Sequence, residues 1–171
     1  MEKKTIDWGE ETERRVAMGV ARFMEGYNCS QSVALAFADW YDVPAGLMAR
    51  MSASFGGGIG RMRETCGSAL GMFLLAGLET ASEHADQVIK AQNYAAVQQL
   101  AADFKAQTGS IVCRELLGLN KRRADGTMPE VAIVATPEPR TAEYYRKRPC
   151  VRMVETAIRT YMAWLAGRSN D

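Results

Sequence analysis

Residues 55–71 read FGGGIGRMRETCGSALG and join a glycine-rich turn to a cysteine and an apolar segment. Glycine tolerates positive φ and close approach of another backbone, so this density of glycine predicts a tight, non-helical turn. Thr65 is a suitable N-cap, which predicts that Cys66 lies in the first turn of the following helix. Free N–H groups and the helix dipole favour a thiolate there, so we expect a lowered pKa for Cys66.

Two other interpretations of this stretch stay open. Gly67 and Gly71 are four residues apart and would let a second helix pack closely, with Cys66 as a small buried residue. Alternatively, the turn forms a backbone nest for an anion or a cluster, with Arg61 and Arg63 nearby. The glycines predicted to bind a cofactor are Gly57, Gly58, Gly60 and Gly67.

The rest of the chain predicts an all-α fold. Apolar residues recur at helical spacing in seven segments, at about 12–25, 29–41, 44–51, 66–77, 89–104, 113–117 and 149–164. Residues 120–140 contain a basic run and two prolines, which predicts a long irregular loop, with a short strand at 131–134. We therefore expect residues 1–171 to form a single compact multi-helix bundle, with the glycine-rich turn leading into a central buried helix.

Composition excludes several classes of function. The chain has 21 Lys and Arg against 20 Asp and Glu, a net charge of +1, so no overall field favours nucleic acid. No apolar run approaches the roughly 20 residues needed to span a bilayer, so we expect no membrane insertion and a cytoplasmic protein. His84, the only histidine, lies among acidic residues and is expected to be solvated.

Four cysteines carry the chemical signal. Each follows a plausible cap or a helix-initiating proline, so we expect four helix-start thiols to converge on one internal spot. Arg146, Lys147, Arg148 and Arg152 flank Cys150. Because cations stabilise a thiolate, Cys150 and Cys66 are the predicted reactive pair. The catalytic candidates are Cys29, Cys66, Cys113 and Cys150.

The order of these motifs resembles the C_GCAxxG_C_C family of four-cysteine redox-active proteins. The resemblance covers about residues 23–165, and one departure is Ser68, where the family has alanine. It rests on the segments 27–33 (YNCSQSV), 56–62 (GGGIGRM), 66–71 (CGSALG) and 113–118 (CRELLG), and on Cys150. It implies a redox role and identifies Cys29, Cys66, Cys113 and Cys150 as the family cysteines.

Three functions fit this pattern. The leading hypothesis is a thiol-dependent oxidoreductase in which one thiolate attacks a disulfide or peroxide and a second cysteine resolves the product. Its partner would be a redox protein or a small thiol or disulfide, and the bundle could form a homodimer. The second is a module in which the same four cysteines bind zinc or an iron–sulfur cluster. The third is a scaffold with two structural disulfides.

Overall fold

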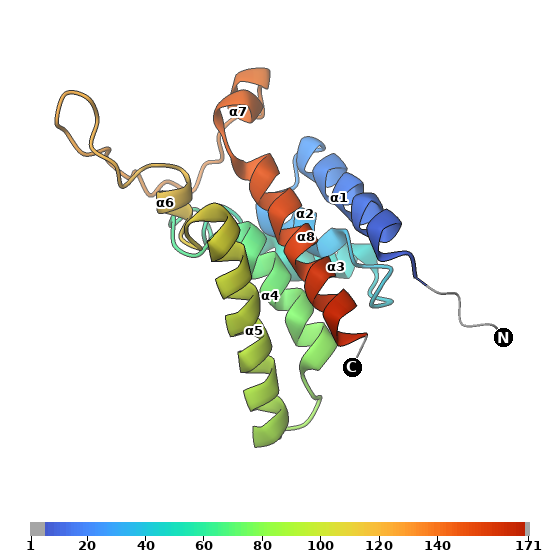
Figure 1. Cartoon of the computed structure of the whole chain (residues 1–171). Coiled ribbons are helices and arrows are strands. Elements are labelled where there is room, and N and C mark those ends of the chain that lie inside the picture. The colour runs from blue at the N-terminus through green and yellow to red at the C-terminus, as the bar shows by residue number, and fades with distance from the viewer. Residues whose placement is uncertain (1–5, 170–171) are drawn as a thin grey trace.

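The structure, a computed structural model, describes residues 6–169, which form eight α-helices and no β-strand (Figure 1). The predicted all-α fold is confirmed. The elements are α1 (Trp8–Met24), α2 (Cys29–Leu35), α3 (Ala45–Ser52), the 3-10 turn η1 (Ala53–Phe55), α4 (Gly67–Thr80), α5 (Gln87–Thr108), α6 (Cys113–Leu116), α7 (Ala142–Lys147) and α8 (Cys150–Arg168). Within the described range, no helix is long and apolar enough to cross a membrane.

The bundle is built around α4 and α8. Helix α4 packs against α2, α5 and α8, while α8 also contacts α1 (Figure 1). Half of α4 is buried, including Met72 and Leu75, which are fully inaccessible to solvent. Aromatic side chains fill the space between the helices: Phe23, Phe37, Phe104 and Tyr161. The predicted central buried helix after the glycine-rich turn is therefore present.

Glycine allows the close approach of α2 and α4. A Cβ atom at Gly71 would lie 2.8 Å from the carbonyl oxygen of Ser30 and 3.0 Å from Cβ of Val33. These separations are too short for a side chain without movement of the α2 backbone. The prediction that Gly71 lets a second helix pack closely is confirmed. This packing brings the start of α2 beside the start of α4.

Helix α2 is shorter than predicted, ending at Leu35 instead of continuing to Tyr41. The reason is a buried arginine from α1. Arg15 is 2% exposed, donates a hydrogen bond to the carbonyl oxygen of Ala36 at 2.6 Å and pairs with Asp39. Because this carbonyl is taken by a side chain, the chain turns away from helical geometry after α2.

Helix α5 also departs from the predicted pattern, because Tyr94 is 58% exposed instead of lying on the buried face. The residue before it, Asn93, faces α4 and donates a hydrogen bond to Oγ1 of Thr80 at 2.9 Å. This contact turns Tyr94 toward solvent, while Leu100 and Phe104 occupy the core as predicted.

The segment between α6 and α7 is the predicted long irregular loop, and it projects from the bundle (Figure 1). The strand predicted at 131–134 is wrong: these residues have no regular structure, and Ile133 and Val134 are exposed. A strand needs a neighbour to supply ladder hydrogen bonds, and residues 6–169 provide none here. Helix α7, which the sequence did not predict, begins where the side chain of Thr141 accepts the N–H of Tyr144.

Candidate functional site

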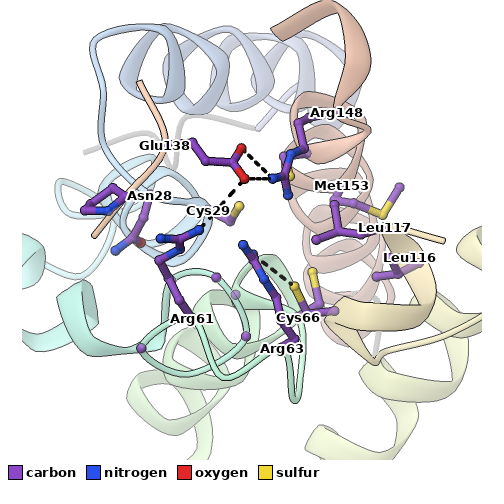
Figure 2. Close-up of a pocket in the computed structure, with 18 of the residues that line it drawn as sticks. Asn28, Cys29, Arg61, Arg63, Cys66, Leu116, Leu117, Glu138, Arg148 and Met153 are labelled. Atoms are coloured by element: carbon purple, nitrogen blue, oxygen red, sulfur yellow. Dashed lines mark hydrogen bonds and ion pairs between the residues drawn. The ribbon is translucent and has the colours of Figure 1, made fainter. Parts of the chain in front are cut away.

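The glycine-rich turn has a left-handed backbone. φ is positive at all five residues from 57 to 61 and again at Arg63. Ile59 and Arg61 adopt φ values of 63° and 64°, and each such residue with a Cβ costs roughly 1–2 kcal/mol. This conformation directs the side chains of Arg61 and Arg63 to the same side of the turn (Figure 2).

Hydrogen bonds inside the turn hold this conformation. The backbone N–H groups of residues 59–64 all donate to carbonyl oxygens of residues 54–59, for example Gly60 to Ser54 at 2.8 Å. These six N–H groups are therefore not free to bind an anion. The backbone nest predicted for residues 56–60 therefore does not hold at residues 59 and 60, and at residues 56–58 it stays a prediction.

A single β-bridge joins the starts of α4 and α6. Thr65 pairs antiparallel with Val112, the N–H of Cys66 donates to Ile111 at 2.7 Å, and the N–H of Cys113 donates to Glu64 at 2.6 Å. Thr65 therefore serves as a bridge residue, and the prediction that it is the N-cap is wrong. Cys66 itself occupies the N-cap position of α4, one residue before the first turn. Because side chains alternate along paired strands, Cys66 and Cys113 point to the same face.

All four cysteines line one cavity of about 300 Å³. Cys29, Cys113 and Cys150 are the first residues of α2, α6 and α8, and Cys66 caps α4. Four helices thus begin around one space, as expected from the position of each cysteine at a helix start. Cys66 and Cys113 are buried, Cys29 and Cys150 are partly exposed, and all four are free thiols.

Cys150 and Cys29 are the two thiols that influence each other's pKa most strongly. Hydrogen bonding with Cys29 is the largest influence on the pKa of Cys150, which it helps to lower to about 7, and hydrogen bonding with Cys150 is the largest influence that raises the pKa of Cys29. Burial opposes the first shift, while the guanidinium groups of Arg148 and Arg140 support it. This mutual influence favours Cys29 as the partner of Cys150, whereas the sequence predicted Cys66.

Cys66 behaves differently from the prediction. Burial raises its pKa to about 11, because a thiolate at this position would lose its hydration. The nearby N–H groups of Ala69 and Ser68 act in the opposite direction without forming a regular capping hydrogen bond. Desolvation therefore outweighs the helix start, and the expected lowered pKa is wrong. Burial also raises the pKa of Cys113, although Nη1 of Arg63 lies 4.0 Å from its sulfur.

Four arginines and one carboxylate also line the cavity. Figure 2 shows Arg61, Arg63 and Arg148 together with Glu138. Glu138, from the segment before α7, pairs with Arg148 and lies 3.9 Å from Arg61. Arg140 is held by aromatic rings: its guanidinium lies 4.4 Å from the centre of the Phe23 ring. Arg61, Arg63 and Arg148 could be recognised from the sequence as neighbours of the turn or of a cysteine. Arg140 and Glu138 could not, because they lie in a loop with no periodic pattern to indicate their position.

The four glycines predicted to bind a cofactor, Gly57, Gly58, Gly60 and Gly67, line the same cavity. At two of them the structure gives a packing reason. A Cβ at Gly58 would lie 2.6 Å from Cβ of Cys113, and one at Gly67 would lie 3.3 Å from Cβ of Cys29. These glycines let the thiols approach the turn, and their role toward a cofactor stays a prediction.

The second hypothesis, that the cysteines bind a metal, depends on how closely the possible ligand side chains lie together. Across residues 6–169, no three side chains of His, Cys, Asp or Glu are grouped closely enough to hold a metal ion. The proposal that the four cysteines bind zinc or an iron–sulfur cluster stays a prediction. His84 is exposed, in agreement with the prediction that it is solvated.

The fold and the cavity together define a class: a helical four-thiol protein in which helix starts bring the cysteines to one arginine-lined space. The chain belongs to the family described as "Putative redox-active protein (C_GCAxxG_C_C)", whose sequence model matches residues 27–164. This family description names redox activity without a specific reaction. Searches of curated proteins and of solved structures gave no match.

Proposed function

We propose that this protein carries out thiol–disulfide exchange, with Cys150 as the attacking thiolate and Cys29 as the resolving thiol. The observation that carries the proposal is that Cys150 and Cys29 line one cavity together with Arg148 and Arg140. Hydrogen bonding with Cys29 and the charges of these two arginines favour the thiolate of Cys150. Nucleophilic attack requires a thiolate, and the best attacking thiol has a pKa near the ambient pH. The pKa of Cys150, about 7, meets that condition.

The first step is attack of the Cys150 thiolate on one sulfur of a substrate disulfide. A bond forms between Cys150 and that sulfur, the substrate S–S bond breaks, and the other half leaves as a thiolate. The product is a mixed disulfide on Cys150. No net oxidation of the two partners together takes place in this step, because one disulfide replaces another.

The second step uses Cys29. Its pKa is raised chiefly by hydrogen bonding with Cys150, with burial and the charge of Cys150 adding to the effect. Conversion of Cys150 to a mixed disulfide removes the neighbouring charge, so Cys29 gives up its proton more readily to water or to the departed thiolate. Its sulfur then attacks Cys150 and releases the second substrate half. The protein loses two electrons, the substrate gains them, and a cellular thiol would return the Cys29–Cys150 disulfide to the reduced state.

The test is to trap the mixed disulfide. We expect reduced Cys29→Ser protein, treated with a small disulfide such as 2-hydroxyethyl disulfide, to accumulate one adduct on Cys150, whereas the wild-type protein releases it and loses two protons. Peptide mass spectrometry locates both products. Cys113→Ser is the matched control and should behave as wild type. An adduct on Cys66 instead of Cys150, or a stable adduct in the wild type, would contradict the assignment.

Native mass spectrometry of protein purified without oxygen separates this proposal from the metal hypothesis. We expect the mass of the polypeptide alone. A mass excess equal to zinc or an iron–sulfur cluster, lost on denaturation, would contradict thiol–disulfide exchange as the resting function, because the thiols would then be ligands.

A further inference from the structure

Arg63 is the unusual group in this cavity. It is 8% exposed, and no carboxylate in residues 6–169 pairs with it within 4.0 Å. Its one polar side-chain contact in that range is the long approach to the sulfur of Cys113. A buried guanidinium is costly unless an anion or a set of hydrogen bonds compensates its charge. Its side chain points into the cavity, so a ligand entering there would meet it (Figure 2).

The other charges around the cavity have the same sign. Four guanidinium groups, from Arg61, Arg63, Arg140 and Arg148, face one carboxylate, from Glu138, which leaves an excess of three positive charges. Arg61 and Arg148 have side chains only 16% and 20% exposed, so water screens them less than ordinary surface arginines. The cavity therefore attracts anions although the whole chain is nearly neutral.

Glu138 shows what kind of anion fits. Both of its carboxylate oxygens accept from Nη2 of Arg148, and one lies 3.9 Å from Nη2 of Arg61 (Figure 2). Its side chain is 45% exposed and belongs to the irregular segment that leads into α7, not to a helix of the bundle. A carboxylate thus already occupies the space between two arginines, on a segment outside the helices of the bundle.

We infer that the substrate is a small disulfide bearing carboxylate groups, and that Arg61, Arg63 and Arg148 bind its carboxylate at the place that the Glu138 side chain otherwise occupies. This inference rests on the proposed function, since it names the substrate class for the same cavity. A carboxylate bound between these arginines would hold the disulfide beside Cys150, because Arg148 precedes that cysteine by two residues. A volume of about 300 Å³ and partly buried thiols suit a small molecule better than a disulfide on a folded protein.

The experiment compares three small disulfides of similar size and different charge: 3,3′-dithiodipropionate with two negative charges, 2-hydroxyethyl disulfide with none, and cystamine with two positive charges. Rates of Cys150 modification are divided by the rates with a free reference thiol, which removes differences in intrinsic reactivity. We expect the dianion to react fastest and the dication slowest. The preference should decrease as salt is added, because screening weakens the attraction.

Variants assign the preference to residues. Arg61→Gln should lower the ratio of dianion to neutral rates by about tenfold, the loss expected from removing one charged hydrogen bond. Glu138→Gln should raise that ratio, because the competing carboxylate is gone. The matched controls lie outside the cavity: Arg122→Gln removes an exposed loop cation, and Glu143→Gln removes a carboxylate that pairs with Lys147 on the surface. Both controls should keep the wild-type ratio.

The outcomes separate this inference from the proposed function. Equal corrected rates for all three disulfides, with Cys150 still reacting, would overturn the carboxylate inference and leave thiol–disulfide exchange intact. A preference for the dianion that Arg61→Gln does not lower and Glu138→Gln does not raise would overturn the assigned residues. Failure of Cys150 to react with any of the three would overturn the proposed function itself, and the inference with it.

Discussion

The hydrogen-bonding contact between Cys29 and Cys150 predicts a measurable change when its donor is removed. Of the influences that lower the pKa of Cys150, the contact with Cys29 is the largest, followed by Arg148 and Arg140. Cys29→Ala deletes the donor, whereas Cys29→Ser replaces the thiol with a hydroxyl that can still donate. We therefore expect the pKa of Cys150 to rise in the alanine variant and to stay near its wild-type value in the serine variant.

The size of the effect follows from the pKa of Cys150, which the site lowers from 9.0 to about 7. At pH 7 about half of Cys150 is thiolate, against about one hundredth at the ordinary pKa. Arg148 and Arg140 remain in Cys29→Ala, so we expect the titration midpoint to rise by about one pH unit and not the whole way. A thiolate of higher pKa is also more nucleophilic, so the rate at pH 7 falls only about twofold. The midpoint is therefore the informative quantity.

The assay is alkylation of Cys150 by iodoacetamide between pH 5 and 10, followed peptide by peptide so that the other three thiols do not interfere. Wild type and Cys29→Ser should give midpoints near pH 7, with Cys29→Ala about one pH unit higher. Two results would refute the reasoning: a wild-type midpoint above about pH 8.5, or a midpoint that Cys29→Ala leaves unchanged. Either would mean that Cys29 does not stabilise the thiolate.

Three further predictions concern the same site. Gly58→Ala should lower the free energy of unfolding in urea by about 2 kcal/mol or more, because φ is 73° at this position and the new Cβ would meet backbone atoms. The control Gly77→Ala has open space around the new Cβ and should raise the free energy of unfolding by up to about 1 kcal/mol. Equal effects of the two substitutions would contradict this prediction. Between pH 9 and 11 the wild type should lose up to about 3 kcal/mol more stability than Cys66→Ala. The reason is that the pKa of Cys66 is raised from 9.0 to about 11, so the folded state holds the thiol proton more tightly than the unfolded state does. Parallel pH profiles of stability for the two proteins would contradict this prediction. Arg148→Gln should raise the midpoint of Cys150 alkylation, and an unshifted midpoint would remove Arg148 from the account.

Much of the fold could be predicted from local sequence. Helical spacing of apolar residues identified seven of the helices, and the glycine-rich turn marked the start of α4. The errors arose where a residue distant in the sequence makes a contact. Arg15 donates a hydrogen bond to the carbonyl oxygen of Ala36, just after the end of α2. Asn93 donates a hydrogen bond to Thr80 on α4, which leaves Tyr94 facing solvent. Helix α7 has too few residues to show a periodic pattern, and Thr141 alone does not distinguish a cap from a loop residue.

The candidate site could be predicted only in part, because sequence gives the kind of residue at a helix start but not its solvation. That the four cysteines share one space could be expected from their positions at helix starts. Their order of reactivity did not, since the burial of Cys66 and the pairing of Cys29 with Cys150 depend on how α2, α4 and α8 pack. Three of the arginines could be recognised from the sequence as basic residues near the turn or near a cysteine. The position of Arg140 beside the cavity could not, because it depends on the loop folding back over Phe23.

The difference between Cys66 and Cys150 shows which physical effect decides thiol reactivity in this cavity. Both lie at a helix start, where free N–H groups favour a thiolate. At Cys66 that help is smaller than the cost of burial, because no cation is among the main influences on its pKa. At Cys150 burial is also unfavourable, but a donated hydrogen bond and three arginines outweigh it. The helix start alone therefore does not make a reactive cysteine here. Because the inner thiols, Cys66 and Cys113, stay protonated at neutral pH, oxidation should begin at Cys150 and end at Cys29, leaving the inner pair reduced.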